Sequence, residues 1–515
     1  MNRRLAVLRS VTIVSVSSYI EYALGLVVSI WIARALGPAD FGRYAFTVWL
    51  CSWMITCCNH ALTTSSTKFI AEADGAGRAD VAAYIGGRLS RLQHWSSAAV
   101  LAVFLLAVLA IRPEEWHGYL LPVTTLVMVA TLAKANYGML VAIEKGQEHF
   151  EPEAIAVVGA GVIGLLLVIG ATIAQAGLLA FIALFAVASL LLNLINRLAY
   201  RRYCAPYRSG PVPEEMRGRL SRHLRLTAVL VLLGSFKAGT LEVFLLNIFA
   251  GSTAVGFFAI AVTLTRGAVQ LFSVGLTSTL LPYMAKSYGE HGHERTAQFL
   301  AEATRFYWAV GLMIAGLGFV TTPDIVTLMY GRRYSDAIPA IEAFLVLAGL
   351  LLIGNSISAF QTVVDRQADR VRVTVISLLA NGIFGLLLVP PLGLAGAVLA
   401  YAATRLTELG VAIFYLRRAT RDGLPVAAML RLFAVGAVAT LAAWLVTIWT
   451  PSFYGFLPGC VVFVALFVPG SIWVRYWSGD DLRLLGNLIG RLGPPGRMLV
   501  RGLDWLQRPA ARSVP

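Results

Sequence analysis

One stretch of the chain, from Leu224 to Ala250, reads LRLTAVLVLLGSFKAGTLEVFLLNIFA. It has the length and apolar content of a membrane-spanning helix, because about 20 apolar residues rising about 1.5 Å each cross a hydrocarbon core. Lys237 and Glu242 nevertheless lie near its middle, and Arg266 lies about twelve residues into the next apolar run, which begins at Ala254. A charge at such depth costs roughly 2.5–3.5 kcal/mol, so we expect these side chains to face water or one another.

The composition of the whole chain indicates an integral membrane protein. Of its 515 residues, 58% are hydrophobic and 13% are charged, whereas a soluble protein has about 25% charged residues. The net charge is +15, but the basic residues lie at the ends of apolar runs, so we predict no nucleic-acid partner. The five cysteines lack metal or disulfide spacing and are expected to be packing residues. We predict no cofactor.

Apolar windows predict an all-α membrane protein. The charge distribution sets its orientation, because cytoplasmic loops are enriched in Lys and Arg. With a cytoplasmic N-terminus, 33 of the 42 Lys and Arg residues lie inside, 5 outside and 4 within spans. This asymmetry favours an even number of spans with both termini cytoplasmic. The fourteen predicted spans are near residues 12–34, 42–66, 91–111, 119–143, 153–174, 177–199, 225–250, 254–283, 304–322, 338–363, 372–389, 392–416, 427–449 and 455–475.

The two halves of the chain repeat. ARALGPADFGRYAF at Ala33–Phe46 aligns with NIFAGSTAVGFFAI at Asn247–Ile260, which pairs Gly37 with Gly251 and Gly42 with Gly256. A second echo aligns LVAIEKGQ at 140–147 with QTVVDRQA at 361–368 and pairs Glu144 with Asp365. Six spans separate equivalent elements, so the two lobes have the same orientation and are suited to alternating access around a central cavity.

These repeats give the expected domain organisation. We predict an N-terminal lobe at 1–200, a basic cytoplasmic linker at 201–222 and a C-terminal lobe at 223–420. The linker is expected to anchor the topology and to contact anionic membrane lipids. Two additional spans follow at 421–475. The tail at 476–515 has leucines at helical spacing and is predicted to form an amphipathic helix on the cytoplasmic surface.

The chain resembles the polysaccharide (Wzx-type) flippases, whose superfamily also contains multidrug and toxin extruders and lipid II flippases. The resemblance covers roughly Ser10 to Arg418 and depends on fourteen spans, like-oriented halves, the A-x-x-L-G-P-x-D-F-G-x-Y signature at Ala33–Tyr44 and the basic turn after the fourth span. It implies translocation of a polyprenyl-diphosphate-linked oligosaccharide to the outer leaflet of the bacterial inner membrane, during O-antigen or exopolysaccharide synthesis. It also implies a polysaccharide polymerase and a chain-length regulator as partners.

Deep basic residues are the candidate substrate site. Lys134, Lys237 and Arg266 lie inside predicted spans, and a cation in a partly dehydrated cavity is suited to bind a diphosphate. We predict that these three side chains converge on that group. The alternative is that each pairs with a carboxylate that holds helices together.

Acidic residues in the spans allow several roles. Glu21, in the first span, is predicted to be a gate that opposes Lys237, an ion-coupling site or a structural residue. Glu242 is a candidate for the same gating or coupling roles. It lies about 140° around the helix from Lys237, so the two side chains are poorly placed to pair with each other. Arg405 and Glu408 are three residues apart and are predicted to form an intrahelical pair. Uncharged polar residues in the spans either line a sugar path or make interhelical hydrogen bonds; they include Asn193, Asn247, Asn355, Asn381 and Gln270.

Other motifs and functions are disfavoured. Gly159, Gly161 and Gly164 spell G-x-G-x-x-G inside an apolar span, which indicates helix packing and no nucleotide site. His291 and His293 lack partners for a metal site. The alternative functions are an ion-coupled multidrug exporter of the same fold, which would require acidic cavity residues, and a membrane glycosyltransferase or polymerase, which would require larger outside loops. A scaffold without transport does not explain the deep charges. We therefore predict a transporter and no enzyme.

Overall fold

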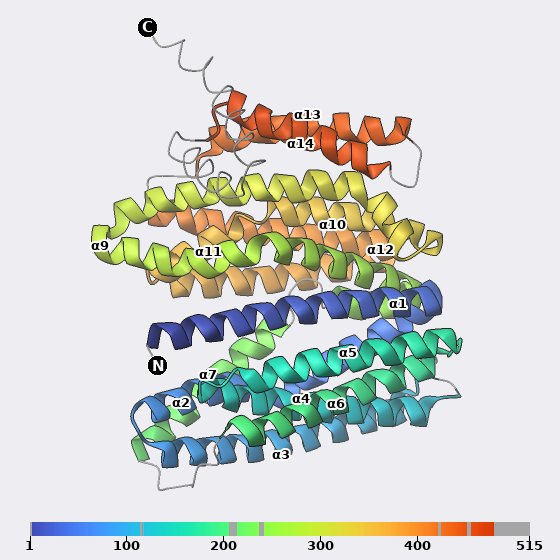
Figure 1. Cartoon of the computed structure of the whole chain (residues 1–515), viewed down its shortest axis with the longest axis vertical. Coiled ribbons are helices and arrows are strands. Elements are labelled where there is room, and N and C mark those ends of the chain that lie inside the picture. The colour runs from blue at the N-terminus through green and yellow to red at the C-terminus, as the bar shows by residue number, and fades with distance from the viewer. Residues whose placement is uncertain are drawn as a thin grey trace. The chain divides into compact units, whose positions relative to one another are not determined.

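The computed structural model describes residues 3–113, 116, 118–204, 214–235, 241–420, 424–450 and 455–477 (Figure 1). Every regular element in these ranges is helical. The α-helices are α1 (Arg3–Asn59), α2 (Leu62–Gly75), α3 (Ala79–Ile111), α4 (Leu120–Gly146), α5 (Glu151–Ile173), α6 (Leu178–Tyr203), α7 (Glu214–Ser235), α8 (Leu241–Phe249), α9 (Gly251–Met329), α10 (Ile338–Leu350), α11 (Gly354–Val363), α12 (Gln367–Ala419), α13 (Val426–Trp449) and α14 (Phe456–Trp473), with a 3₁₀ turn at Arg332–Ala337.

Eleven helical segments in the described ranges are long and apolar enough to cross a membrane. Two of them, Thr12–Asn59 and Gln367–Ala419, contain a sharp break at Gly37 and at Gly393 respectively, so each contributes two spans. Helices α7 and α8 cover the seventh predicted span, of which residues 236–240 lie outside the described residues. The all-α, multi-pass prediction is confirmed, and the described helices cover the predicted spans apart from residues 236–240 of the seventh.

The chain forms two compact units. The first unit contains Met1–Ala259 with Asn381–Tyr401, and the second contains Ile260–Ala380 with Ala402–Pro515. The unit boundaries follow packing and do not coincide with the lobe boundaries that the sequence predicts, which stay a prediction. The predicted linker is described in part: residues 214–222 belong to α7, where Arg219 pairs with Glu72 of α2 at 2.9 Å. Residues 205–213 and the predicted amphipathic helix after residue 477 lie outside the described residues.

In the first unit, α4, α5 and α6 pack side by side, and α3 lies against α4 (Figure 1). The helix of the second span ends at Asn59, and after a short turn the chain continues as α2. Helix α2 buries Leu62, Phe69 and Ile70 in a core that α3, α4 and α7 complete. This packing fixes the end of α4 that carries several charged residues.

In the second unit, the two C-terminal helices pack on the latter part of α9. Phe463 and Phe467 of α14 are buried with Leu432 of α13 and Leu312 of α9. The Trp308 indole N–H donates a hydrogen bond of 2.9 Å to the carbonyl of Met429. Helices α13 and α14 are therefore integrated into this unit, although the repeat does not include them.

The first sequence echo has the same backbone in both halves. We call residues 37–42 and 251–256 the glycine turns. Gly37 has φ 74° and Gly251 has φ 79°, values that glycine adopts without steric cost. A Cβ on Gly42 would overlap the carbonyl oxygen of Ser252, and a Cβ on Gly256 would lie 2.6 Å from that of Pro38. The two turns thus pack backbone to backbone within the first unit, which explains why both carry glycine.

The second echo is real, but its predicted register is wrong. We call residues 145–153 and 362–370 the polar turns. Helix α4 ends at Gly146 and α11 at Val363, and the left-handed residues that follow are Glu148 and Asp365, so equivalent positions are 217 residues apart. Glu144 therefore corresponds to Gln361, four residues before the predicted Asp365. The helix end decides the register, because similar charged residues occur at several positions around each turn.

Candidate functional site

The predicted site residues are distributed over both units. Glu21 on α1, Lys134 on α4 and Glu242 on α8 belong to the first unit, and Arg266 on α9 belongs to the second. Lys237 lies outside the described residues. The structure places Glu21 and Lys134 close enough for their charges to interact. The convergence of Lys134, Lys237 and Arg266 on one ligand stays a prediction.

Lys134 lies half-buried near the middle of α4. Its ammonium nitrogen lies 4.7 Å from the ring centroid of Phe185 on α6, a cation–π contact. In the described ranges, no carboxylate lies within ion-pair distance of Lys134, so these residues do not support the alternative of a helix-holding ion pair. The aromatic face holds the cation in place and leaves its N–H groups able to donate to an anion.

Glu21 is exposed on α1 and lies within electrostatic reach of charged groups of its own unit. These groups are Lys134 and Lys145 of α4 and Glu153 of α5. The predicted pairing with Lys237 is not described. The surroundings of Glu21 are therefore a mixed charge network, and the gating, coupling and structural roles all stay predictions.

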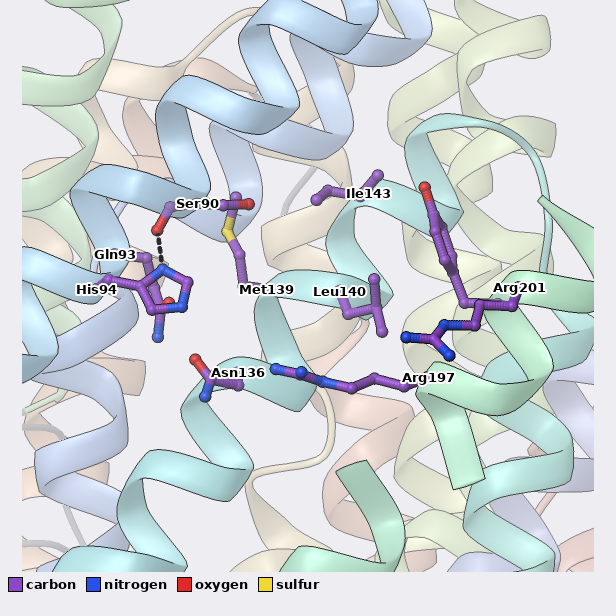
Figure 2. Close-up of a pocket in the computed structure, with 10 residues that line it drawn as sticks. Ser90, Gln93, His94, Asn136, Met139, Leu140, Ile143, Arg197 and Arg201 are labelled. Carbon is purple, nitrogen blue, oxygen red and sulfur yellow. Dashed lines mark hydrogen bonds between the residues drawn. The ribbon is translucent and has the colours of Figure 1, made fainter. Parts of the chain in front are cut away.

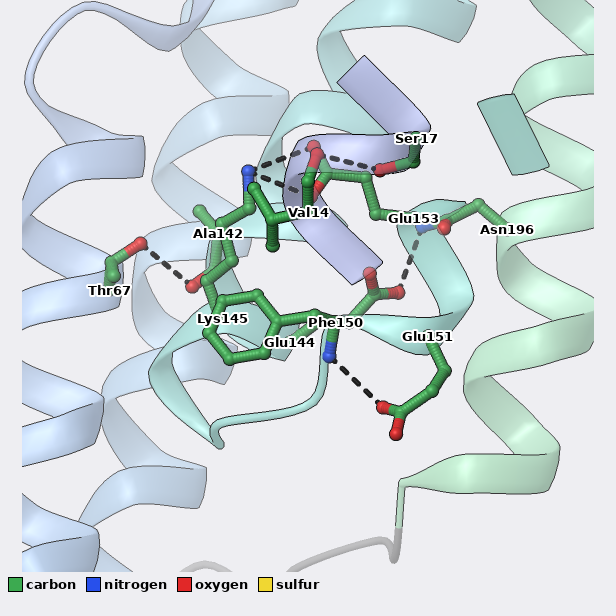
Figure 3. Close-up of polar contacts among 10 residues, drawn as sticks. All are labelled: Val14, Ser17, Thr67, Ala142, Glu144, Lys145, Phe150, Glu151, Glu153 and Asn196. Atoms are coloured by element: carbon green, nitrogen blue, oxygen red, sulfur yellow. Dashed lines mark hydrogen bonds and ion pairs between the residues drawn. The ribbon is translucent and has the colours of Figure 1, made fainter. Parts of the chain in front are cut away.

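Sequence reasoning missed a buried polar centre beside this network (Figure 3). The Glu144 side chain is completely buried, and its Oε1 accepts a hydrogen bond of 2.9 Å from the Asn196 side-chain amide on α6. Next to it, the Lys145 ammonium forms an ion pair of 2.8 Å with Glu153 across the polar turn. The signal was available, since Asn196 stands inside an apolar span, where a buried amide requires a partner.

Glu242 is a second buried carboxyl group in the first unit that accepts a hydrogen bond from an asparagine amide. It is completely buried in the first turn of α8, and its Oε1 accepts a hydrogen bond of 2.7 Å from the Asn381 amide on α12. Of the two predicted roles for Asn381, the interhelical hydrogen bond is therefore observed. The gating or coupling role of Glu242 stays a prediction.

Arg266 differs from Lys134 in its surroundings. It is exposed on α9, and within the described part of the chain no carboxylate lies within ion-pair distance of it. A spanning helix carries an exposed arginine at low cost only where that face lines water. That Arg266 lines a polar cavity stays a prediction.

Two minor predictions are confirmed. Arg405 and Glu408 form an intrahelical ion pair of 2.8 Å. The glycines of the G-x-G-x-x-G motif pack against neighbouring helices of the first unit, with Gly161 against Leu24 of α1. No group of metal-ligating side chains occurs among the described residues.

Similar structures show what the fold is. The lipid II flippase MurJ in an inward closed conformation superposes with a TM-score of 0.70 at 12% identity, over 90% of this chain and 98% of that chain. An inward-facing MATE-family multidrug resistance transporter of the MOP superfamily gives 0.61 at 15% identity, over 80% and 98%. A variant of the Vibrio cholerae MATE transporter VcmN gives 0.55 at 14% identity, over 81% and 99%. The chain has the fold of these transporters.

The family follows from the sequence match. No curated protein matches the chain. The model of the family described as "Polysaccharide biosynthesis protein" matches residues 7–288, which is more than half of the chain and includes the first six spans and both glycine turns. The protein therefore belongs to the polysaccharide biosynthesis protein family.

Proposed function

We propose that the protein is a flippase that moves a polyprenyl-diphosphate-linked oligosaccharide from the cytoplasmic to the outer leaflet of the bacterial inner membrane. Family membership supports a role in polysaccharide synthesis. The likeness to MurJ, described as a lipid II flippase, supports a lipid-linked substrate. Alternating access between the two lobes would carry the headgroup across, and a polymerase with its chain-length regulator would use the product.

The deep cations carry this proposal. Lys134 lies near the middle of α4, and Arg266 lies near the start of α9, inside the span predicted at 254–283; neither forms an ion pair with a described carboxylate. A diphosphate is a concentrated anion that such groups can bind, with Arg266 able to use two N–H groups at once. Export of an anion across an inside-negative membrane releases about 2.3 kcal/mol per charge per 100 mV, so the membrane potential alone favours this direction.

Cells that lack the protein test the function. We expect completed polyprenyl-diphosphate oligosaccharide to accumulate on the cytoplasmic leaflet, where periplasmic enzymes and membrane-impermeant reagents do not reach it. Mass spectrometry of the extracted lipid would identify the glycan. If the lipid-linked units reach the outer leaflet and remain unpolymerised, the flippase function is excluded and a polymerase or scaffold function takes its place.

Charge-removing variants test the site. We expect Lys134→Gln, Lys237→Gln and Arg266→Gln, combined in one chain, to abolish complementation of the deletion. Lys286→Gln is the matched control, because Lys286 lies on α9 as Arg266 does but is 70% exposed and pairs only weakly with Glu290, at 3.7 Å. Full complementation by the triple variant, at normal membrane abundance, would remove these residues from the substrate site.

A further inference from the structure

A pocket in the first unit lies between α3, α4 and α6 (Figure 2), and neither Lys134 nor Glu21 is among its lining residues. Its volume is about 300 Å³, at the lower end of the range for small-ligand sites, which begins at about 300 Å³. Its lining includes Gln93 of α3, Asn136 and Leu140 of α4, and Arg197 and Arg201 of α6.

Two arginines supply one side of this pocket. Figure 2 shows Arg197 reaching from α6 across the pocket toward Asn136, with Arg201 one turn further along the helix. The Arg197 Nε–H donates a hydrogen bond of 3.3 Å to the Asn193 side-chain oxygen, which leaves the two terminal nitrogens of the guanidinium to bind a ligand. Within the described ranges neither arginine pairs with a carboxylate. The pocket therefore has an uncompensated positive charge in the geometry that suits a phosphate group.

The opposite side carries acceptors that lack a donor. Gln93 is completely buried, and its amide donates to Ser97 at 3.0 Å, while its Oε1 has no partner among the described residues. The Asn136 Oδ1 is likewise buried and without a partner there. Buried polar atoms are nearly always hydrogen-bonded, so two such acceptors beside a cationic pair call for a ligand or water that donates. A phosphate ester with free hydroxyl groups satisfies both sides.

The surroundings of the pocket are apolar. Leu194 and Leu198 are exposed on α6 and, at spacings of three or four residues, share one helix face with Arg197 and Arg201. Trp95 on α3, two residues after Gln93, is 76% exposed, and tryptophan is enriched at the membrane interface. Helix α3 has 33 residues and is about 50 Å long, so Gln93 lies near the level at which it leaves a hydrocarbon core of about 30 Å.

We propose that this pocket binds the headgroup of an anionic phospholipid from the leaflet at the basic end of the first unit. Arg197 and Arg201 hold the phosphate, the Gln93 and Asn136 carbonyl oxygens accept from headgroup hydroxyls, and the acyl chains lie on Leu194 and Leu198. The distribution of Lys and Arg places this end in the cytoplasm. The site is independent of the transported substrate, because it uses none of the deep charges assigned to that substrate.

Native mass spectrometry of the full chain tests the proposal. The protein would be released from nanodiscs that contain phosphatidylglycerol and phosphatidylcholine in equal amounts, and the retained lipids counted. We expect retention of phosphatidylglycerol over phosphatidylcholine, and a loss of that preference by at least about tenfold in Arg197→Gln/Arg201→Gln, since each arginine near an anionic headgroup contributes several-fold. Arg202→Gln is the matched control, because Arg202 neighbours Arg201 on α6 but does not line the pocket.

A second variant separates the pocket from surface charge. Leu140→Trp keeps both arginines and fills the cavity, and we expect it to lose phosphatidylglycerol as the double variant does. Each variant would first be shown to have the thermal stability of the parent in detergent. Equal phosphatidylglycerol retention by the parent and the double variant would overturn the proposal. Retention of added polyprenyl phosphate in place of phosphatidylglycerol, dependent on the same arginines, would also overturn it and assign the pocket to the substrate lipid.

Discussion

The polar turns of the two halves share a backbone and differ in charge. In the first half, the Lys145 ammonium pairs with Glu153, eight residues on. In the second half, the Arg370 guanidinium donates a hydrogen bond of 3.0 Å to the Thr362 hydroxyl, eight residues before it. With the structural register of 217 residues, Lys145 corresponds to Thr362 and Glu153 to Arg370. Each turn is closed by a polar contact at the same place, but the cation has moved from one end of the contact to the other.

The buried position before each turn has diverged in the same way. Glu144 is completely buried and bonded to Asn196, whereas its equivalent Gln361 is 4% exposed and its Nε2 has no partner in the described ranges. Both are polar side chains of nearly the same size. The repeat therefore preserves shape and backbone direction, while the ionisable chemistry near Glu21 and Lys134 belongs to the first half alone.

The glycine turns have kept both their shape and their two glycines, and the reason at Gly42 and Gly256 is steric. They pack on each other, so a side chain at Gly42 or Gly256 meets the backbone of the other turn. The polar turns have room for different side chains, whereas Gly42 and Gly256 have no room for any side chain. We therefore expect substitutions in the glycine turns to have the larger effects.

Gly42→Ala is expected to have the largest effect. Its Cβ would overlap the Ser252 carbonyl oxygen, which is backbone and cannot rotate away, and overpacking of this kind costs about 1–3 kcal/mol or more. We expect a clear fall in the thermal midpoint in detergent and loss of complementation. Gly25→Ala is the matched control on the same helix, because a Cβ there meets nothing within 4 Å. A Gly42→Ala protein as stable as the Gly25→Ala protein would show that the turns are not held in contact.

Asn196→Leu is expected to have an intermediate effect. It leaves the buried Glu144 carboxylate without its donor, and an unsatisfied buried group costs about 1–3 kcal/mol, more when charged. Glu144→Gln should cost less, because an amide can keep the bond to Asn196 and Gln361 occupies the equivalent site. Chemical unfolding of both variants measures the difference. If Glu144→Gln is the more destabilised of the two, the carboxylate charge itself is required, and the two halves differ in function at this position.

Exchange of the polar turn is expected to have the smallest effect. Lys145→Thr and Glu153→Arg singly each remove a partly exposed ion pair, which contributes about 0.2–1 kcal/mol. The double variant recreates the contact of Thr362 and Arg370, so we expect it to recover most of the loss. A double-mutant cycle on the unfolding free energy gives the coupling. Additive losses in the double variant would mean that the two turns are not interchangeable.

The sequence alone determined the membrane class, the spans and the first echo. Hydrophobic run length and the placement of basic residues depend on transfer from water to lipid, a property of each segment by itself. Lys134, Glu21 and Arg266 could be identified in the same way, because a charged residue inside an apolar run is evident from the sequence of that run alone. The glycine turns could be found in the sequence because positions 37 and 251 have a positive φ, which favours glycine at both.

Only the tertiary structure decided which polar groups meet. The partners of Glu144 and Glu242 are 52 and 139 residues away, and a hydrogen bond depends on distances that no local pattern encodes. The register of the polar turns was decided by where α4 and α11 end, and the contact between Gly42 and Gly256 by packing within the first unit. The pocket of Arg197 and Arg201 likewise exists only because three helices place a buried amide and two arginines around one space.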